Sequence, residues 1–295
     1  MRLYTIVNPH GGKKKGLDTL RKIKSRFDIA GCKLDIIMTE YAGHAKELAS
    51  SLDFSDYDGL VIIGGDGSFH EVANGMMDRD KSDRLPIGII PAGSGNSVAR
   101  DLNLLAPIDS VAAILRAKSK PFDIIESNYN GVKKYAINII GWGLVTDIGL
   151  KAENYRWLGS SRYTILSVLE VFKNRPRHAE LIIDGVAYAN DFTFIIVCNT
   201  VHTGKGMKMA PKALIDDGLI DIVVVRYGAS KIHLLNTLPK VFKGTHIDDR
   251  FVDYYHGKEF SLRSDNKDTL NIDGEMIGST PISGKVIRHA LSIFR

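Results

Sequence analysis

The segment at residues 61–72, VIIGGDGSFHEV, joins an apolar run to a glycine-rich turn that holds a single carboxylate. The apolar residues predict a buried strand, and a helix-like sequence follows the turn. The glycines let backbone N–H groups approach a phosphate, and Asp66 between them could hold Mg²⁺ or accept a proton from an attacking hydroxyl. Alternatively, Asp66 caps the following helix, although Ser68 is equally well placed to do so. Glu71 faces the same loop, unless it only complements the helix dipole.

Three further loops have the same character: NPHGGKKKG at 8–16, MTEYAGHA at 38–45 and PAGSGNSVAR at 91–100. Each follows a predicted strand. Because parallel strands end at one edge of a sheet, the loops should converge there. None of them matches GxxxxGK[ST] or GxGxxG, so the P-loop and the dinucleotide fingerprint are absent. A solvated turn is the alternative to phosphate contact for Lys13–Lys15, and a purely structural turn is the alternative for Asn96.

Two acidic segments in the second half could also take part in chemistry. Carboxylates and turn carbonyls are dense in APKALIDDGLID, residues 210–221, and such groups can ligate a hard cation. In NIDGE, residues 271–275, Glu275 stands next to an Asp-Gly pair. A tight turn without chemistry is the alternative for both Asp-Gly pairs.

The first half predicts a doubly wound parallel sheet, since strands alternate with helices across short glycine-rich turns. The strands are expected at 2–7, 32–38, 57–63 and 85–90, and the helices at 17–27, 42–52, 68–77, 97–102 and 108–117.

The pattern changes near residues 118–121, which places a boundary near residue 120 and predicts domains at 1–120 and 121–295. The second domain has period-two alternation and predicts a mostly antiparallel β-sandwich or barrel-like sheet. Its strands are expected at 133–140, 180–184, 187–189, 191–198, 219–226, 259–263 and 286–294, with helices at 159–173 and 230–242.

The composition is that of an ordinary globular protein, with 295 residues that are 44% hydrophobic and 25% charged. Two distant cysteines favour a reducing, cytoplasmic setting. No secretion signal is recognised, and no apolar run approaches the roughly 20 residues that span a bilayer. The formal charge of +5 is too mild to indicate a nucleic-acid partner, but it suits anionic phosphates or a membrane surface.

The order NPHGG, GGDGSFHEVANG, PAGSGNSVAR, DGLID and NIDGE resembles the diacylglycerol kinase catalytic-domain family of lipid kinases, which includes bacterial lipid kinases, sphingosine kinases and ceramide kinases. The resemblance covers essentially the whole chain. GGDG alone is shared with NAD kinases and, more loosely, phosphofructokinases. The family implies a nucleotide-binding α/β domain, a β-rich lipid-binding domain and ATP in the cleft between them.

The resemblance also implies roles for individual residues. The GGDG carboxylate, Asp66, would be catalytic and contact the substrate. Glu275 matches the proton acceptor of bacterial members. The sequence does not decide which of the two accepts the proton. The structural Mg²⁺ site of bacterial members corresponds to the carbonyls of Leu214 and Leu219 with the carboxylate of Asp217. The ATP site corresponds to Asn8, His10, Gly11, Gly12, Thr39, Gly64, Gly65, Gly67, Ser68, Glu71, Gly93, Ser94, Gly95, Asn96, Asp273 and Gly274.

Residues 141–162 resemble the sphingosine and ceramide kinase branch, in which Arg156 and Arg162 match arginines that approach the ATP phosphates. The acidic residue that reads the lipid head in sphingosine kinases is replaced here by Gly149. Asp147 is the alternative contact for the lipid, and the identity of the lipid stays open.

The function expected from the resemblance is transfer of the γ-phosphoryl group of ATP, with Mg²⁺, to a primary hydroxyl of a membrane lipid of sphingoid or diacylglycerol type. The enzyme would contact the membrane peripherally, through an apolar lip at Tyr155, Trp157, Leu158 and residues 166–172, unless that stretch is a core helix. A soluble NAD kinase-like enzyme and a catalytically inactive lipid-binding protein are the alternatives. The oligomeric state stays open, with a homodimer among the possibilities.

Overall fold

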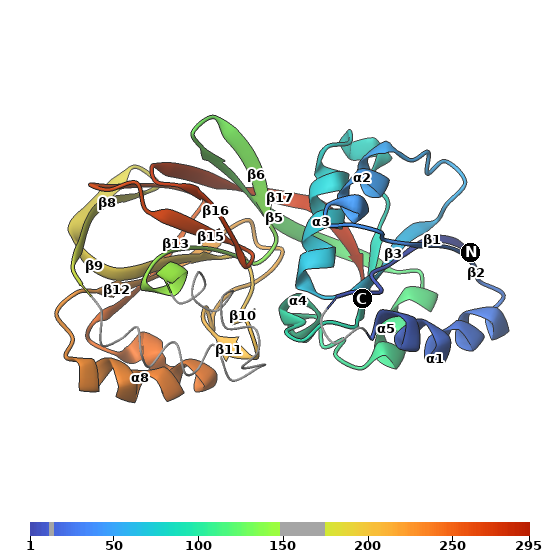
Figure 1. Ribbon diagram of the computed structural model, residues 1–295, viewed down its shortest axis with the longest axis horizontal. Coiled ribbons are helices and arrows are strands. Elements are labelled where there is room, and N and C mark those ends of the chain that lie inside the picture. Colours follow the sequence, from blue (N-terminus) through green and yellow to red (C-terminus); the bar gives the residue numbers. More distant parts are fainter. Residues whose placement is uncertain (12–14, 148–174) are drawn as a thin grey trace.

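The computed structural model describes residues 1–11, 15–147 and 175–295 and shows a chain folded into two lobes (Figure 1). The N-terminal lobe holds a parallel sheet in the order β2-β1-β3-β4. Its strands are β1 (Arg2–Val7), β2 (Lys33–Met38), β3 (Gly59–Gly64) and β4 (Ile87–Pro91). The four strands predicted for this lobe are therefore present, and the doubly wound α/β prediction is confirmed.

Helices cover both faces of this sheet, because successive residues of a strand point to opposite sides. Leu60 and Ile62 of β3 pack with α2 (His44–Ser51) and α3 (Asp66–Met77). Val61 and Ile63 pack with α1 (Gly16–Ile29) and α5 (Pro107–Leu115) on the other face. The short α4 (Ser97–Asp101) follows β4, and a 3₁₀ turn, η1, spans Lys81–Asp83.

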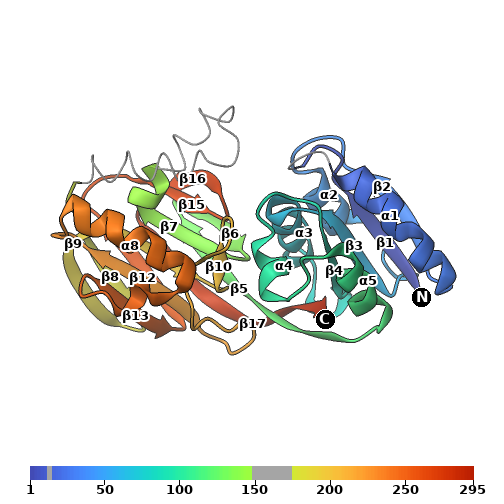
Figure 2. The same ribbon diagram turned by 90° about the horizontal axis from the view of Figure 1, so that it is seen from below.

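The C-terminal lobe is mostly antiparallel, as predicted, and packs its sheet around a core that includes Trp142 and Leu262. Helix α8 (Lys231–Lys243) lies on its surface (Figure 2). A 3₁₀ turn, η3, spans Thr245–Asp248. The strands are β6 (Val132–Ala136), β7 (Ile139–Gly143), β8 (Arg177–Ile183), β9 (Val186–Cys198), β12 (Ile220–Arg226), β13 (Val252–Gly257), β14 (Glu259–Ser264), β15 (Thr269–Ile272) and β16 (Glu275–Ser279), with a separate hairpin of β10 (His202–Thr203) and β11 (Met207–Lys208).

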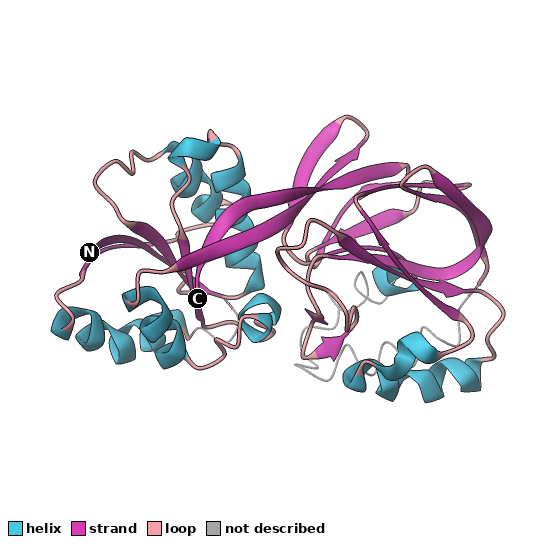
Figure 3. Ribbon diagram, turned by 180° about the vertical axis from the view of Figure 1, so that it is seen from behind, coloured by secondary structure: helices cyan, strands magenta, loops and turns pink. Residues whose placement is uncertain are grey.

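Two long strands join the lobes. β5 (Ser119–Tyr129) and β17 (Ile282–Phe294) pair antiparallel and run together from one lobe to the other (Figure 3). The far end of β17 reaches β4, where Ile293 pairs with Ile87 in parallel. The buried side chain of Phe294 belongs to the core beneath α1 and α5. The chain therefore ends in the N-terminal lobe, and the lobes are connected twice.

Several predictions in the second half were wrong in detail. The single strand expected at 133–140 is two strands, β6 and β7, and the expected strands at 187–189 and 191–198 are one strand, β9. Strands β5, β13, β15 and β16 were not predicted. In β5, the run Phe122–Ile125 is buried without interruption, so no period-two alternation marks it. The helix predicted at 159–173 lies outside the described residues.

Candidate active site

The β3–α3 and β4–α4 loops pack backbone against backbone. A Cβ atom on Gly93 would lie 2.5 Å from the Cα of Gly65, and a Cβ on Gly65 would lie 3.0 Å from the Cα of Gly93. A Cβ on Gly64 would lie 2.6 Å from the Cβ of Ser68. Atoms in protein interiors do not approach that closely, so packing alone requires these three glycines. Their presence is therefore not in itself evidence for a bound phosphate.

Gly67 is different from the other glycines of the motif. It is exposed, and no atom lies within 4 Å of the position that its Cβ would take. It lies in the first turn of α3, where no side chain caps the helix. The N–H groups of such a turn are suited to an anion. The space in front of α3 therefore fits a phosphate group, and Gly67 is the glycine whose missing side chain keeps that space open.

Asp66 is the first residue of α3, but its carboxylate caps α4. Oδ2 accepts the N–H of Ser97 at 3.0 Å, and Oδ1 accepts the N–H of Val98 at 3.3 Å. The alternative that Asp66 or Ser68 caps the helix after the motif does not hold, because no side chain caps α3 and the helix that Asp66 caps lies beyond the next strand. Burial raises the pKa of the Asp66 carboxyl, and the N–H groups of Ser97 and Val98 oppose that rise. A Cβ on Gly95 would lie 2.9 Å from Oδ2, so the carboxylate is closely enclosed.

The loop after β1 folds onto the same helix. Nδ2 of Asn8 donates a hydrogen bond to Oγ of Ser68 at 2.9 Å. The Ser68 hydroxyl therefore contacts the loop after β1. Oδ1 of Asn8 accepts the N–H groups of His10 and Gly11 at 3.0 and 2.8 Å. Asn8 therefore shapes this loop, and the exposed His10 lies at its surface. Gly12, also predicted to contact ATP, lies outside the described residues.

The remaining two loops are tied in by backbone and side-chain contacts. The buried Thr39, after β2, donates its N–H to the carbonyl of Val7 at 2.9 Å. Glu71 of α3 accepts the N–H of Ala45 at the start of α2, at 3.2 Å. Asn96 forms a closed loop with Gly93 through two 3.0 Å hydrogen bonds and has φ 55°, whereas Ser94 is exposed. All four loops thus meet at one edge of the sheet, and the predicted convergence is confirmed.

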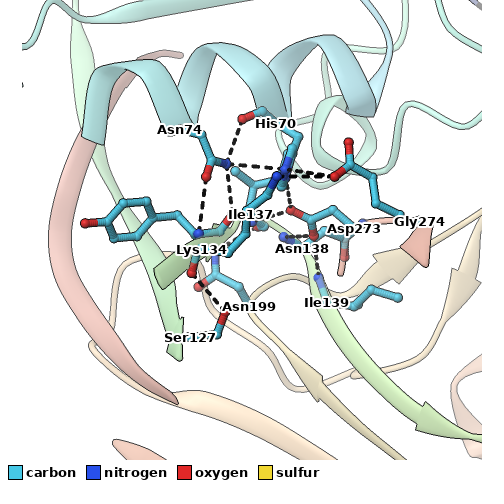
Figure 4. Close-up of polar contacts among 12 residues, drawn as sticks. His70, Asn74, Ser127, Lys134, Ile137, Asn138, Ile139, Asn199, Asp273 and Gly274 are labelled. Atoms are coloured by element: carbon cyan, nitrogen blue, oxygen red, sulfur yellow. Dashed lines mark hydrogen bonds and ion pairs between the residues drawn. The ribbon is translucent and has the colours of Figure 1, made fainter. Parts of the chain in front are cut away.

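The C-terminal lobe contributes the hairpin turn between β15 and β16. Asp273 and Gly274 occupy its two central positions with φ 52° and 96°, which are the values of a tight turn. The Asp273 carboxylate accepts the N–H groups of Ile137, Asn138 and Ile139 at 2.7–2.9 Å (Figure 4). These three N–H groups belong to the break between β6 and β7 and to the first residue of β7, which explains why the predicted strand at 133–140 is interrupted.

Asp273 also joins the two lobes. Oδ2 lies 2.7 Å from Nδ1 of His70 in α3, and both side chains are almost fully buried (Figure 4). Asn74, one turn further along α3, donates to the carbonyl of Tyr135 and accepts its N–H at 2.9 and 3.2 Å. His70 and Asn74 were missed by the sequence reasoning. Their spacing from Asp66 could have identified them, since positions 66, 70 and 74 share one face of a helix.

Glu275 follows this turn and lies beside the lobe junction. Its carboxylate is 46% exposed, with Oε2 at 3.3 Å from Nζ of Lys134 and at 3.9 Å from Nε2 of His70. Glu275 is thus held by one flexible cation, whereas both oxygens of Asp66 are bound by backbone. The two predicted catalytic carboxylates come from opposite lobes, and His70 lies on the helix of one and beside the other.

The β10–β11 hairpin closes the junction on its other side, and its residues were also missed. His202 pairs through Nδ1 with the buried carboxylate of Asp101 in α4, which also accepts the His202 N–H at 3.2 Å. Ser97 donates from Oγ to the carbonyl of Gly204 at 3.2 Å. The hairpin of one lobe is therefore fastened to the helix that Asp66 caps.

Comparison with known proteins agrees with this two-lobed arrangement. The family model of the diacylglycerol kinase catalytic domain matches residues 2–127, and that of the YegS C-terminal NAD kinase beta sandwich-like domain matches residues 138–295. The chain belongs to the diacylglycerol kinase catalytic-domain family. The resemblance stated from the motifs is confirmed.

Relatives in this family include both kinds of lipid kinase. Sphingosine kinase 1 of Arabidopsis thaliana is 28% identical over 98% of this chain and 71% of its own length. Diacylglycerol kinase of Bacillus subtilis is 27% identical over 95% of this chain and 91% of its own. In fold, the chain matches a candidate diacylglycerol kinase from Bacillus anthracis with a TM-score of 0.82 at 24% identity, covering 99% and 94% of the two chains.

Besides Gly12, two more of the residues expected from the family lie outside the described residues, and another is already paired. Arg156 and Arg162 are outside the described residues. The Asp147 carboxylate forms an ion pair with Nη2 of Arg177, whose side chain is buried. Within the described part of the chain, Asp147 is thus neutralised by a cation of the protein itself.

The metal site expected from the family would depend on few groups. Oδ1 of Asp217 accepts the N–H of Leu219 at 2.9 Å, which leaves Oδ2 for a cation together with the carbonyls of Leu214 and Leu219. In residues 1–11, 15–147 and 175–295, no three His, Cys, Asp or Glu side chains gather closely enough to hold a metal ion. One carboxylate with two carbonyls suits a hard, largely hydrated cation such as Mg²⁺.

Among the residues that the structure describes, no helix has the length and apolar character to cross a membrane.

Proposed function

We propose that the protein is an ATP-dependent lipid kinase that phosphorylates a primary hydroxyl of a diacylglycerol or sphingoid type lipid. The observation that carries the proposal is the meeting of the Asp66 helix and the Glu275 hairpin at the junction of two domains that match one lipid kinase family. The open first turn of α3 at Gly67 supports a phosphate position between them.

In the proposed reaction, N–H groups in the first turn of α3 bind the phosphates of ATP. Asp66 fixes the β4–α4 loop against α3, since both of its oxygens accept N–H groups of α4. Glu275, half exposed and held by Lys134, accepts the proton of the lipid hydroxyl. The hydroxyl oxygen then bonds to the γ-phosphorus while the bond from that phosphorus to ADP breaks. Mg²⁺ bound with ATP would neutralise phosphate charge. Asp217 and the carbonyls of Leu214 and Leu219 are the proposed ligands of a separate, structural Mg²⁺.

The Asp147–Arg177 pair favours a lipid whose polar head carries no positive charge. An acidic residue can recognise a sphingoid ammonium only if its charge is not already neutralised, and Asp147 has a cationic partner. Diacylglycerol is therefore the proposed first choice within the lipid class.

The direct test is incubation with labelled ATP, Mg²⁺ and vesicles that contain diacylglycerol, monoacylglycerol, sphingosine or ceramide, with NAD as a soluble acceptor. We expect a phosphorylated glycerolipid as the main product, formed far more slowly by Glu275→Gln. Phosphorylation of NAD alone would indicate the soluble kinase, and no product from any acceptor, with intact ATP and lipid binding, would indicate an inactive lipid-binding protein. Phosphosphingosine as the main product would refute the assignment of Asp147.

Peripheral membrane contact is proposed through α8. The apolar lip expected at residues 155–172 lies outside the described residues, but α8 has an outer face of its own. That helix contains no acidic residue. Ile232 is 72% exposed and Phe242 47% exposed. Lys240 and Lys243 also lie on this exposed side. Exposed apolar side chains among lysines suit the interface of an anionic bilayer.

Charge and apolar substitutions on α8 should separate vesicle binding from chemistry. We expect the double variant Ile232→Ser, Phe242→Ser to bind anionic vesicles at least about tenfold more weakly, given roughly 0.8 kcal/mol per buried methylene. Activity on a short-chain, water-soluble lipid analogue should not change, because Ile232 and Phe242 are exposed and α8 lies away from α3 in Figure 1. Sedimentation with vesicles measures the first quantity. Asn236→Ser on the same exposed side is the matched control, and unchanged binding by the double variant would refute this surface.

A further inference from the structure

His70 is a buried residue at the centre of the lobe junction, and no step described above uses it. Its side chain is 2% exposed, and it lies one helical turn after Asp66. Nδ1 is 2.7 Å from Oδ2 of Asp273, which belongs to the hairpin that carries Glu275 (Figure 4). The contact joins residues that are 203 positions apart in the sequence.

The hydrogen bonds around Asp273 determine which nitrogen of His70 carries a proton. The carboxylate is 1% exposed and accepts three backbone N–H groups, so it acts as an acceptor, and the proton of its contact with His70 lies on the ring. Nδ1 is therefore the N–H nitrogen. Nε2 is the end of the ring left for another partner.

The groups facing Nε2 leave Glu275 as that partner. Nδ2 of Asn74 lies 3.4 Å away, but its two hydrogens are directed to the carbonyls of His70 and Tyr135, each at 2.9 Å. An amide nitrogen has no third hydrogen to donate. Oε2 of Glu275 lies 3.9 Å from Nε2, and Lys134 approaches the same oxygen from β6. A small rotation of the half-exposed Glu275 side chain brings its carboxylate within hydrogen-bond distance of the ring. Because a carboxylate only accepts, this hydrogen bond forms when Nε2 carries a proton as well as Nδ1.

We infer that His70 is a positioning residue for the reaction proposed above. It anchors the β15–β16 hairpin to α3 through Nδ1, and through Nε2 it holds the Glu275 carboxylate in register with the phosphate position in front of that helix. Asp273, Glu275 and Lys134 are the charged groups that face it. The inference rests on the proposed function, because it gives a position to a carboxylate that acts only in that reaction.

A purely structural role would involve Nδ1 alone, so two amide substitutions can separate the two ends of the ring. The amide nitrogen of His70→Asn matches Nδ1 and retains the bond to Asp273, but nothing replaces Nε2. The amide nitrogen of His70→Gln matches Nε2 instead and loses the bond to Asp273. The structural role predicts normal turnover for His70→Asn. The positioning role predicts a lower kcat, at an unchanged KM for ATP and a melting temperature close to that of the parent protein.

The expected result for His70→Asn is a kcat lower by about 10- to 100-fold, which is the scale of a small misplacement of a reacting group. Lys134→Met removes the other contact of Glu275 and leaves the ring in place, so comparing the kcat of the two variants separates the contribution of His70 from that of Lys134. Full turnover by His70→Asn would overturn the inference. We expect His70→Gln to lower the melting temperature more than His70→Asn does.

A measurement on the full chain without substrate keeps the inference testable if the kinase assay fails. Imidazole ¹⁵N spectra of the parent protein should contain the signals of nine histidines. The signals that disappear in His70→Asn or His70→Gln are those of His70. Glu275→Gln should shift the Nε2 resonance of His70 and leave its Nδ1–H protected from exchange. An unmoved Nε2 resonance would refute the contact. A shifted resonance without lipid phosphorylation by the parent protein would refute the proposed function and leave the contact standing.

Discussion

Exchange of Asp66 for asparagine is expected to weaken ATP binding and to lower kcat together, whereas exchange of Glu275 for glutamine should lower kcat alone. Each kcat should fall by on the order of 10²- to 10⁴-fold, which is the usual contribution of a positioned proton acceptor or of the loops that orient the substrate. The difference arises because Asp66 holds the backbone of α4, while Glu275 holds only a lysine. In Asp66→Asn, the amide NH₂ would replace one carboxylate oxygen. Its hydrogens would then face the N–H of Ser97 or Val98, which would lose its acceptor.

Titration of ATP binding and steady-state kinetics on the same lipid vesicles measure the two quantities. Lys22→Ala, on the exposed face of α1, is the control, and we expect it to change kcat by less than about threefold, as surface substitutions usually do. Full ATP affinity in Asp66→Asn together with a large loss of kcat would move the proton acceptor from Glu275 to Asp66. Thermal unfolding should show Asp66→Asn destabilised by about 1–3 kcal/mol, because a buried N–H donor loses its acceptor.

Alanine substitution should separate the two kinds of glycine in the phosphate loops. Gly93→Ala places a Cβ 2.5 Å from the backbone of Gly65 and is expected to cost about 1–3 kcal/mol of unfolding free energy, with ATP binding lost as the loops separate. Gly67→Ala meets no atom within 4 Å and lies inside α3, so the free protein should be equally stable or more stable by up to about 1 kcal/mol. Its ATP affinity should nevertheless fall, because the methyl group enters the space proposed for phosphate.

Chemical denaturation of the free protein and titration with ATP distinguish these outcomes. Gly67→Ala is the informative member of the pair, since a loss of ATP affinity without a loss of stability has no explanation in packing. Equal ATP affinity in Gly67→Ala and the parent protein would remove the first turn of α3 from the proposed phosphate site. An undisturbed fold in Gly93→Ala would show that the loops can move apart without cost.

Much of the first lobe could be predicted from the sequence because its signals are local. Strands and helices alternate over short distances, and glycine-rich loops follow four strands that share one edge of the sheet. The second lobe was predicted less well. Strand β5 is buried along Phe122–Ile125 without alternation, and the β6–β7 break depends on Asp273, which lies more than a hundred residues later in the chain.

Within the site, the sequence by itself determined the family, the two candidate carboxylates and the loops that meet at the edge of the sheet, because residue type and order are enough for those. Tertiary structure decided what each residue contacts. Asp66 caps a helix 31 positions further on, three of the glycines are required by loop packing, and His70 meets Asp273 from the other lobe. Local sequence carries no record of such pairs, since their partners come together only when the sheet, the hairpin and the strands that join the two lobes are all in place.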